Sequence, residues 1–336
     1  MPQSAESRPA RRLVLVVGKG RSGTSLLAGI LGRLGFHVPQ PEVKADRTNP
    51  RGFSEPRWVV RFHKRLLHAR GVTAFDARSG AWGQLAELAN DGDVVEELSS
   101  WLEARFAQAE NLVVKDPRIV WFLPLWLRSA DELDVRTSFV TMIRRPAEVV
   151  ASGRASYGTW QNDASRALSW LDVTLHAEHA TRGARRAFIR YDDLLEDWAR
   201  EISRCGEQVD VPWLAGIDRA RHPDVDAFVD PALHRSAVGW DGVRLPAALQ
   251  SLSEDVWTQM SGLAEPGGDS EDARSRLDAV RVALPDLDLT ASAGLPLVVR
   301  LMLLVPPRYR ARLPRPVVHA ARRIVRGRRK RRVEAS

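Results

Sequence analysis

Short apolar runs alternate along the chain with longer segments whose apolar residues repeat with the period of a helix. The first run, residues 13–17, is continuous and rich in β-branched residues, which is typical of a strand buried on both faces of a parallel sheet. Similar runs predict strands over 111–115, 135–143 and 187–191. Because strands of this kind alternate with helices, the pattern predicts an α/β fold.

Helices are predicted between these strands. Apolar residues from Leu26 to Leu34 lie on one helical stripe, and Gly35 is placed to end that helix. Another helix is expected to begin at Pro146, because proline is favoured in a first helical turn. The predicted helices after the first are thus 119–129, 146–156, which begins at Pro146, and 164–181.

The turn between the first strand and the first helix is rich in glycine, with the sequence Gly18-Lys-Gly-Arg-Ser-Gly23. A helix start after a buried strand presents unpaired backbone N–H groups and the positive end of the helix dipole, which suits a phosphate. Ligands of parallel sheets bind at the carboxyl ends of the strands. The sequence therefore predicts a P-loop-like three-layer domain, with a central parallel sheet covered by helices on both faces.

Two common phosphate-binding patterns fit this loop poorly. A dinucleotide-binding GxGxxG motif requires an acidic residue about 20 positions later, at the end of a second strand, and that place falls in the proline-broken stretch 38–42. A nucleoside triphosphate loop has the spacing of Gly18 and Gly23 but requires a lysine where Thr24 stands. A kinase acting on a nucleotide or small molecule remains an alternative.

The segment from Gly20 to Ser25 resembles the 5′-phosphosulfate loop of sulfotransferases that use 3′-phosphoadenosine 5′-phosphosulfate (PAPS). The resemblance implies that Arg21 lies beside the transferring sulfuryl group, where many members carry lysine. Arginine keeps the charge and offers two donors, but it gives up a proton less readily. By the same resemblance, the loop residues that bind the cosubstrate are Lys19, Gly20, Arg21, Ser22, Gly23, Thr24 and Ser25.

The second signature of the family is an arginine at a strand end and a serine eight residues later, which together bind the 3′-phosphate. Arg144 and Ser152 have this spacing, and the adjacent Arg145 is an alternative to Arg144. Tyr191 begins a segment that resembles the one whose tyrosine approaches the adenine. Arg235 is a weaker match for an additional arginine at the 3′-phosphate.

Two further stretches, 49–55 and 115–118, resemble the bacterial and carbohydrate-directed branches of the family. In the small-molecule branch a histidine base follows the lysine by two residues, but here that position is a proline. The base is therefore expected to be Glu55 or Asp116, since a carboxylate can accept the acceptor's proton. Glu55 is slightly favoured, because Asp116 precedes a proline and can form an Asx turn. Lys115 is expected to help neutralise the transferring group.

The resemblance implies in-line transfer of a sulfuryl group from PAPS to a hydroxyl of a glycan, glycolipid or secondary metabolite. A carbohydrate or lipid-linked acceptor is expected, and the reaction requires no metal. His176 and His179 lie three residues apart on a predicted helix, but no third metal ligand is evident.

Positive charge is concentrated at the end of the chain. The formal net charge is +8, yet residues 306–336 contain twelve Lys or Arg against one Glu, so this segment carries +11 and the rest −3. The chain is accordingly divided into a flexible arm (1–12), a sulfotransferase domain (13–290) and a basic tail (291–336).

The tail gives a further alternative function, a module that binds a membrane surface or nucleic acid. It is expected either to be disordered or to lie on anionic lipid. Because the rest of the chain is slightly acidic, no nucleic-acid partner is expected. The single cysteine and the lack of a long apolar run predict a cytoplasmic protein, with a peripheral position at the inner face of the membrane as an option.

Overall fold

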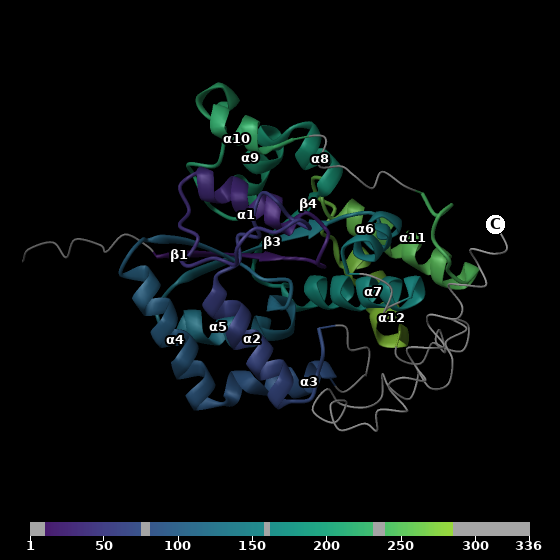
Figure 1. Ribbon diagram of the computed structural model, residues 1–336, viewed down its shortest axis with the longest axis horizontal. Helices are drawn as coiled ribbons and strands as arrows, with labels where there is room; N and C mark the ends of the chain where they lie inside the picture. Colours follow the sequence, from purple (N-terminus) through teal and green to yellow (C-terminus); the bar gives the residue numbers. More distant parts are fainter. Residues whose placement is uncertain (1–10, 75–80, 158–161, 231–238, 285–336) are drawn as a thin grey trace, which may run out of the picture.

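A central sheet of four parallel strands organises the computed structural model, which describes residues 11–74, 81–157, 162–230 and 239–284. The spatial order is β2-β1-β3-β4, with helices on both faces (Figure 1). The predicted α/β fold with a covered parallel sheet is thus confirmed. The strands are β1 (Arg12–Val17), β2 (Asn111–Lys115), β3 (Arg136–Ile143) and β4 (Arg185–Arg190).

The strand boundaries agree closely with the sequence pattern. Arg12, assigned from sequence to the arm, is the first residue of β1 and pairs with Asn111 of β2. The last strand ends one residue earlier than predicted, because Tyr191 begins helix α8 instead.

Alternating side chains of the strands build two separate cores. Leu13, Leu15 and Val17 belong to one core, and Val14 and Val16 to the other, because successive strand residues point to opposite faces. The first core is covered by α2 (Arg57–Ala69), α3 (Ala81–Ala86), α4 (Gly92–Phe106), α5 (Leu123–Asp131) and α7 (Asp163–Ala180). The second is covered by α1 (Thr24–Arg33), α8 (Tyr191–Glu196), α9 (Trp198–Gln208) and α10 (Pro223–Phe228).

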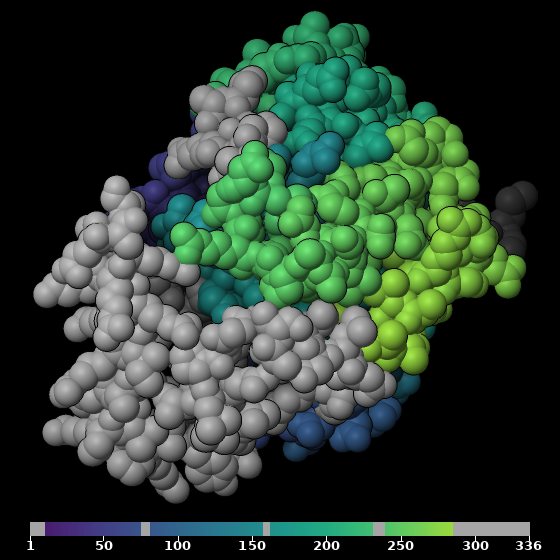
Figure 2. Space-filling model, turned by 90° about the vertical axis from the view of Figure 1, so that its right-hand side faces the viewer, coloured from purple at the N-terminus to yellow at the C-terminus, as the bar shows by residue number. Residues whose placement is uncertain are grey.

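A third core lies beside the β4 edge of the sheet, among α6 (Pro146–Tyr157), α7, α11 (Ala247–Gly262) and α12 (Glu271–Ala283). Figure 2 shows α11 and α12 on this flank of the molecule. Short 3₁₀ turns span Glu87–Asn90, Ile119–Phe122 and Arg219–Arg221.

The helix predicted over 119–129 is a 3₁₀ turn followed by α5. Pro124 lies in the first turn of α5. Proline has no N–H to donate, and its ring clashes with the carbonyl four residues earlier, so an α-helix cannot run through it from Ile119.

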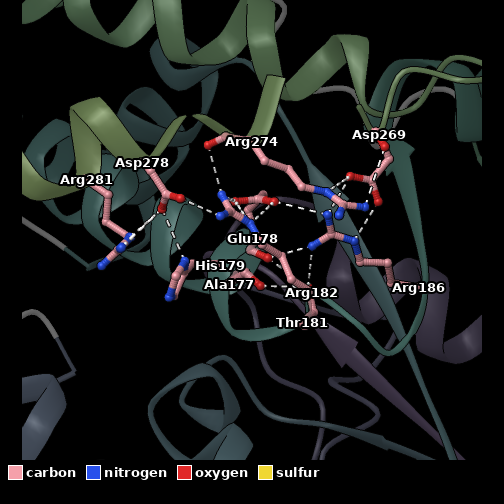
Figure 3. A network of polar contacts seen from close by, with 10 residues as sticks. All are labelled: Ala177, Glu178, His179, Thr181, Arg182, Arg186, Asp269, Arg274, Asp278 and Arg281. Atoms are coloured by element: carbon pink, nitrogen blue, oxygen red, sulfur yellow. Dashed lines mark hydrogen bonds and ion pairs between the residues drawn. The ribbon is translucent and has the colours of Figure 1, made fainter. Parts of the chain in front are cut away.

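A buried carboxylate ties α12 to α7 and β4 (Figure 3). Glu178 is fully buried on α7 and receives hydrogen bonds from the guanidinium groups of Arg182 and Arg186. Arg186 also binds Asp269, and Arg182 also binds Asp278 of α12. The network therefore fixes the last described helix against the sheet.

Some sequence predictions fall outside the described residues. These are Arg235, nearly all of the arm and the whole basic tail. Within the described part of the chain, no helix is both long and apolar enough to cross a membrane.

Candidate active site

A cleft of about 940 Å³ opens at the carboxyl ends of the strands. The glycine-rich loop follows β1, Lys115 ends β2, Arg144 follows β3 and Tyr191 follows β4. The parallel sheet thus brings together residues that are far apart in the sequence. The predicted residues that line the cleft are Lys19, Gly20, Arg21, Gly23, Thr24, Ser25, Glu55, Lys115, Arg144, Ser152 and Tyr191.

The glycine-rich loop is shaped by close backbone contacts. Gly18 has a φ of 140°, and a Cβ there would lie 2.6 Å from the carbonyl oxygen of Met142. Gly23, the N-cap of α1, has a φ of 92°, and a Cβ there would lie 2.3 Å from Cδ2 of Tyr191. Glycine is therefore required at both positions. The first turn of α1, whose first N–H groups have no partner within the helix, lines the cleft through Thr24 and Ser25.

Arg144 is buried at the end of β3, with only 6% of its surface exposed. Its Nε donates to Glu148 at 2.8 Å, its Nη1 donates to the carbonyl oxygen of Arg21 at 3.2 Å, and its guanidinium carbon lies 4.2 Å from the ring centre of Tyr191. Its Nη2 is buried and has no hydrogen-bond partner among the described residues. A buried donor left unpaired is costly, so this nitrogen suits an anionic ligand.

Ser152 lies two turns along α6 and meets the same loop. Its Oγ accepts a hydrogen bond from Nε of Arg21 at 3.1 Å. Arg144 and Ser152 therefore both contact Arg21, Arg144 through its carbonyl oxygen and Ser152 through its side chain. The alternative, Arg145, is exposed outside the cleft lining, where its guanidinium lies over the ring of Trp257.

Lys115 connects the glycine-rich loop to Glu55. Its Nζ donates to Oε1 of Glu55 at 2.6 Å, to Oγ of Ser25 at 3.1 Å and to the carbonyl oxygen of Phe53 at 3.3 Å. Burial lowers the pKa of Lys115, although the Glu55 carboxylate opposes this effect. Lys115 therefore lies in the cleft between the carboxylate of Glu55 and the glycine-rich loop.

Asp116 has a different environment from Glu55. It is fully buried outside the cleft lining, and it accepts hydrogen bonds from Nδ1 of His63 at 2.9 Å and from the backbone N and Nε of Arg118, both at 3.0 Å. Burial raises the pKa of Asp116, but the His63 hydrogen bond and the Arg118 charge outweigh it and hold the pKa well below its usual range. Asp116 is thus a poor proton acceptor.

His63 and Arg118 are functional candidates that the sequence did not single out. Nε1 of Trp126 donates to Nε2 of His63 at 2.9 Å, so His63 is neutral and carries its proton on Nδ1. Burial lowers the pKa of His63, against the effect of Asp116. Asp116 in turn holds Arg118, whose Nη2 lies 3.7 Å from Oε2 of Glu55. The chain of contacts orients Arg118 at the cleft wall.

Lys19 extends from the loop to α7. Its Nζ donates to Oγ of Ser169 at 2.5 Å. Burial lowers the pKa of Lys19 to about 7, although the nearby Asp172 carboxylate opposes this effect. The loop therefore contains a lysine that changes charge near neutral pH.

Arg166 of α7 is a further cleft residue that the sequence did not single out. It is 6% exposed and lies one turn before Ser169. One feature of the sequence could have indicated Arg166: it is a charged residue among the small and apolar residues that α7 buries. Among the described lining residues, Glu55 is the one carboxylate, against the cations Lys19, Arg21, Arg47, Lys115, Arg118, Arg144 and Arg166.

The two histidines of α7 have protein partners. Nδ1 of His176 lies 2.8 Å from the carbonyl oxygen of Asp172, and its ring stacks on Trp82. Nδ1 of His179 lies 3.1 Å from Asp278. Within the described ranges, no group of three or more His, Cys, Asp or Glu residues is arranged to hold a metal ion.

Comparisons with known proteins give matches among solved structures alone: no family model matches the chain, and no curated protein does. One similar structure is described as "Sulfotransferase Domain from the Curacin Biosynthetic Pathway"; it is 16% identical, the match covers 76% of this chain and 99% of that one, and the TM-score is 0.44. Another is described as "Sulfotransferase Domain from the Synechococcus PCC 7002 Olefin Synthase", with 19% identity, coverage of 77% and 98%, and a TM-score of 0.41.

Proposed function

We propose that the chain is a PAPS-dependent sulfotransferase, which transfers a sulfuryl group to a hydroxyl of a carbohydrate or lipid-linked acceptor. The observation that carries the proposal is the convergence of Arg144 and Ser152 on Arg21, with a buried Nη2 of Arg144 that has no partner in the described structure. A 3′-phosphate beside this nitrogen satisfies the donor and distinguishes PAPS from ATP.

The rest of the cosubstrate follows from that placement. The free N–H groups of α1 and the loop bind the 5′-phosphate, since a helix N-terminus favours an anion. Arg21 lies beside the sulfuryl group, and Tyr191 contacts the adenine. The excess of cations in the cleft lining suits a ligand with several negative charges.

In the proposed reaction, the acceptor oxygen forms a bond to sulfur while its proton passes to Glu55. The bond between sulfur and the oxygen of the 5′-phosphate breaks, and adenosine 3′,5′-bisphosphate leaves. Glu55 is the base because it lines the cleft, whereas Asp116 is buried outside the lining and is hydrogen bonded to His63 and Arg118.

Lys115 lies between the proposed base and the loop that binds the leaving phosphate. It lies 2.6 Å from Glu55 and 3.1 Å from Ser25 of the phosphate loop. When Glu55 takes the proton, the charge of Lys115 is no longer offset and stabilises the negative charge that develops on the leaving phosphate. Fixed positive charge of this kind is a large part of catalysis in related group transfers.

The test is calorimetric binding of adenosine 3′,5′-bisphosphate and of AMP, which lacks the 3′-phosphate. We expect the bisphosphate to bind more tightly, and Arg144→Ala to weaken it about 10- to 100-fold with little effect on AMP. Arg145→Ala is the matched control and should leave both affinities unchanged. Equal affinity of the natural protein for the two nucleotides, or turnover of ATP with magnesium, would refute the proposal.

A further inference from the structure

A cluster of arginines lies at the amino ends of three neighbouring strands. Arg12 begins β1, Arg136 begins β3 and Arg185 begins β4, and Arg12 and Arg136 are directly opposite in the register of the two strands. The cleft opens at the other ends of the same strands. Because β1 has six residues, its ends lie about 17 Å apart. This amino-end cluster (Arg12, Arg136 and Arg185) is therefore separate from the candidate active site.

The three arginines converge on Asp210, which follows α9. Nη1 of Arg12 donates to the carbonyl oxygen of Asp210 at 2.7 Å. Nη1 of Arg136 and Nε of Arg185 both lie 3.9 Å from Oδ2 of Asp210. Within the described ranges, Asp210 is the one carboxylate that pairs with the cluster, and the side chains of Arg136 and Arg185 form no hydrogen bond.

The charge of the amino-end cluster is only partly balanced. Three guanidinium groups face one carboxylate, so they repel one another more than Asp210 can offset. The side chains of Arg136, Arg185 and Asp210 are each about half exposed, which lets a ligand reach them from solvent. A doubly charged tetrahedral anion matches the excess charge, and a guanidinium offers paired N–H donors to its oxygens.

An exposed tryptophan borders the cluster. The guanidinium carbon of Arg12 lies 5.6 Å from the ring centre of Trp213. The ring is held by a hydrogen bond from Nε1 to the carbonyl oxygen of Leu34 at 3.2 Å and by contact with Phe36 at 5.4 Å between ring centres. Even so, 42% of Trp213 is exposed. Its indole N–H is therefore a local reporter of events at Arg12.

We propose that Arg12, Arg136 and Arg185 form a second anion-binding site, which takes a phosphate or sulfate group. Asp210 balances part of the charge and holds the guanidinium groups together when no anion is bound. Because the site lies at the opposite end of the strands from the cleft, its ligand leaves the cleft open. The inference does not depend on the proposed function. Inorganic phosphate and a phospholipid headgroup present the same chemical group, and the experiment distinguishes them.

The first experiment is an NMR titration of the full-length, ¹⁵N-labelled protein with inorganic phosphate and with sulfate, at an ionic strength held constant with sodium chloride. The indole signal of Trp213 is assigned from its loss in Trp213→Phe. We expect this signal to move to saturation. Arg136→Gln and Arg185→Gln should each weaken binding about 3- to 10-fold. Asp210→Asn should tighten it, because the variant removes the negative charge that competes with the anion.

Arg128→Gln is the matched control, since Arg128 is an exposed arginine of α5 that pairs with a single carboxylate, Glu132. It should leave the titration midpoint unchanged. A Trp213 signal that moves in proportion to anion concentration without saturating would overturn the inference. So would equal midpoints for the natural protein, Arg136→Gln and Asp210→Asn. Thermal unfolding of each variant confirms that folded proteins are compared.

The second experiment identifies the source of the anion by sedimentation with vesicles of phosphatidylcholine alone or mixed with phosphatidic acid. It compares the natural protein with the double variant Arg136→Gln/Arg185→Gln, which has the same basic tail. With a saturable Trp213 signal, reduced sedimentation of the double variant supports a site for a lipid headgroup, and equal sedimentation supports a site for a free anion. Without that signal, either result counts against the site.

Discussion

Under the proposed function, we expect the charge of Lys19 to make nucleotide binding depend on pH. Its Nζ donates a hydrogen bond to Ser169 of α7, and burial lowers the pKa of Lys19 to about 7 against the opposing effect of Asp172. An anionic phosphate at the loop stabilises the protonated form, so the complex holds a proton that the free protein loses as pH rises above 7. Affinity for adenosine 3′,5′-bisphosphate should therefore fall with increasing pH.

The magnitude follows from the pKa of about 7 in the free protein. If Lys19 stays protonated in the complex, each pH unit well above 7 costs about a factor of ten, or about 1.4 kcal/mol. Between pH 7 and pH 9 the loss is about 50-fold. The second ionisation of a phosphate monoester, at about pH 6, is largely complete in this range and contributes little.

The assay is titration calorimetry with the bisphosphate at pH 7, 8 and 9. Lys19→Arg keeps the charge throughout and should bind tightly with little pH dependence, whereas Lys19→Met should bind weakly with little pH dependence. Lys115 is another cleft lysine whose pKa burial lowers, so Lys19→Met also isolates its contribution. A natural protein as insensitive to pH as Lys19→Arg, or a Lys19→Met variant with the natural slope, would refute the reasoning.

Three further substitutions test separate parts of the structure. Gly23→Ala places a methyl group 2.3 Å from Cδ2 of Tyr191 at a φ of 92°; it should lower the free energy of unfolding by about 2–4 kcal/mol, measured with urea, and an unchanged midpoint would contradict this. Glu178→Gln leaves Arg182 and Arg186 without their buried counter-charge and should cost about 3–5 kcal/mol in the same measurement; a loss below about 1 kcal/mol would show that the network contributes little. Glu55→Gln should slow sulfuryl transfer from labelled PAPS to a cell-envelope extract about 10²- to 10⁴-fold while bisphosphate affinity is retained, and a near-natural rate would exclude Glu55 as the base.

The sheet and the glycine-rich loop at its edge were predictable because their signals are local. A continuous apolar strand, a glycine turn and a helical stripe lie next to one another in the sequence, and parallel strands must place their carboxyl ends at one edge. The closeness of Arg144 and Ser152 in the cleft was predictable for the same reason, since one strand end and two helical turns fix their separation.

The remaining site residues depend on contacts between distant segments. The choice of Glu55 over Asp116 as the proposed base depends on His63. This residue lies 53 positions from Asp116 in the sequence and forms a hydrogen bond with its carboxylate. Likewise, Arg166 reaches the cleft because α7 packs across α6 at Gly153. Helical periodicity predicts a buried stripe, but it does not predict which neighbouring element that stripe contacts.

Because of the strand order β2-β1-β3-β4, the two sides of the cleft are built from different segments of the chain. Segments on the β2 side supply Glu55 and Lys115, whereas segments after β3 and β4 supply Arg144, Ser152 and Tyr191. The loop after β1, the strand between them, is common to both. Under the proposed function, the base therefore comes from the stretch between α1 and β2, and the groups that recognise the 3′-phosphate come from segments after β3, so substitutions can alter one function without altering the other.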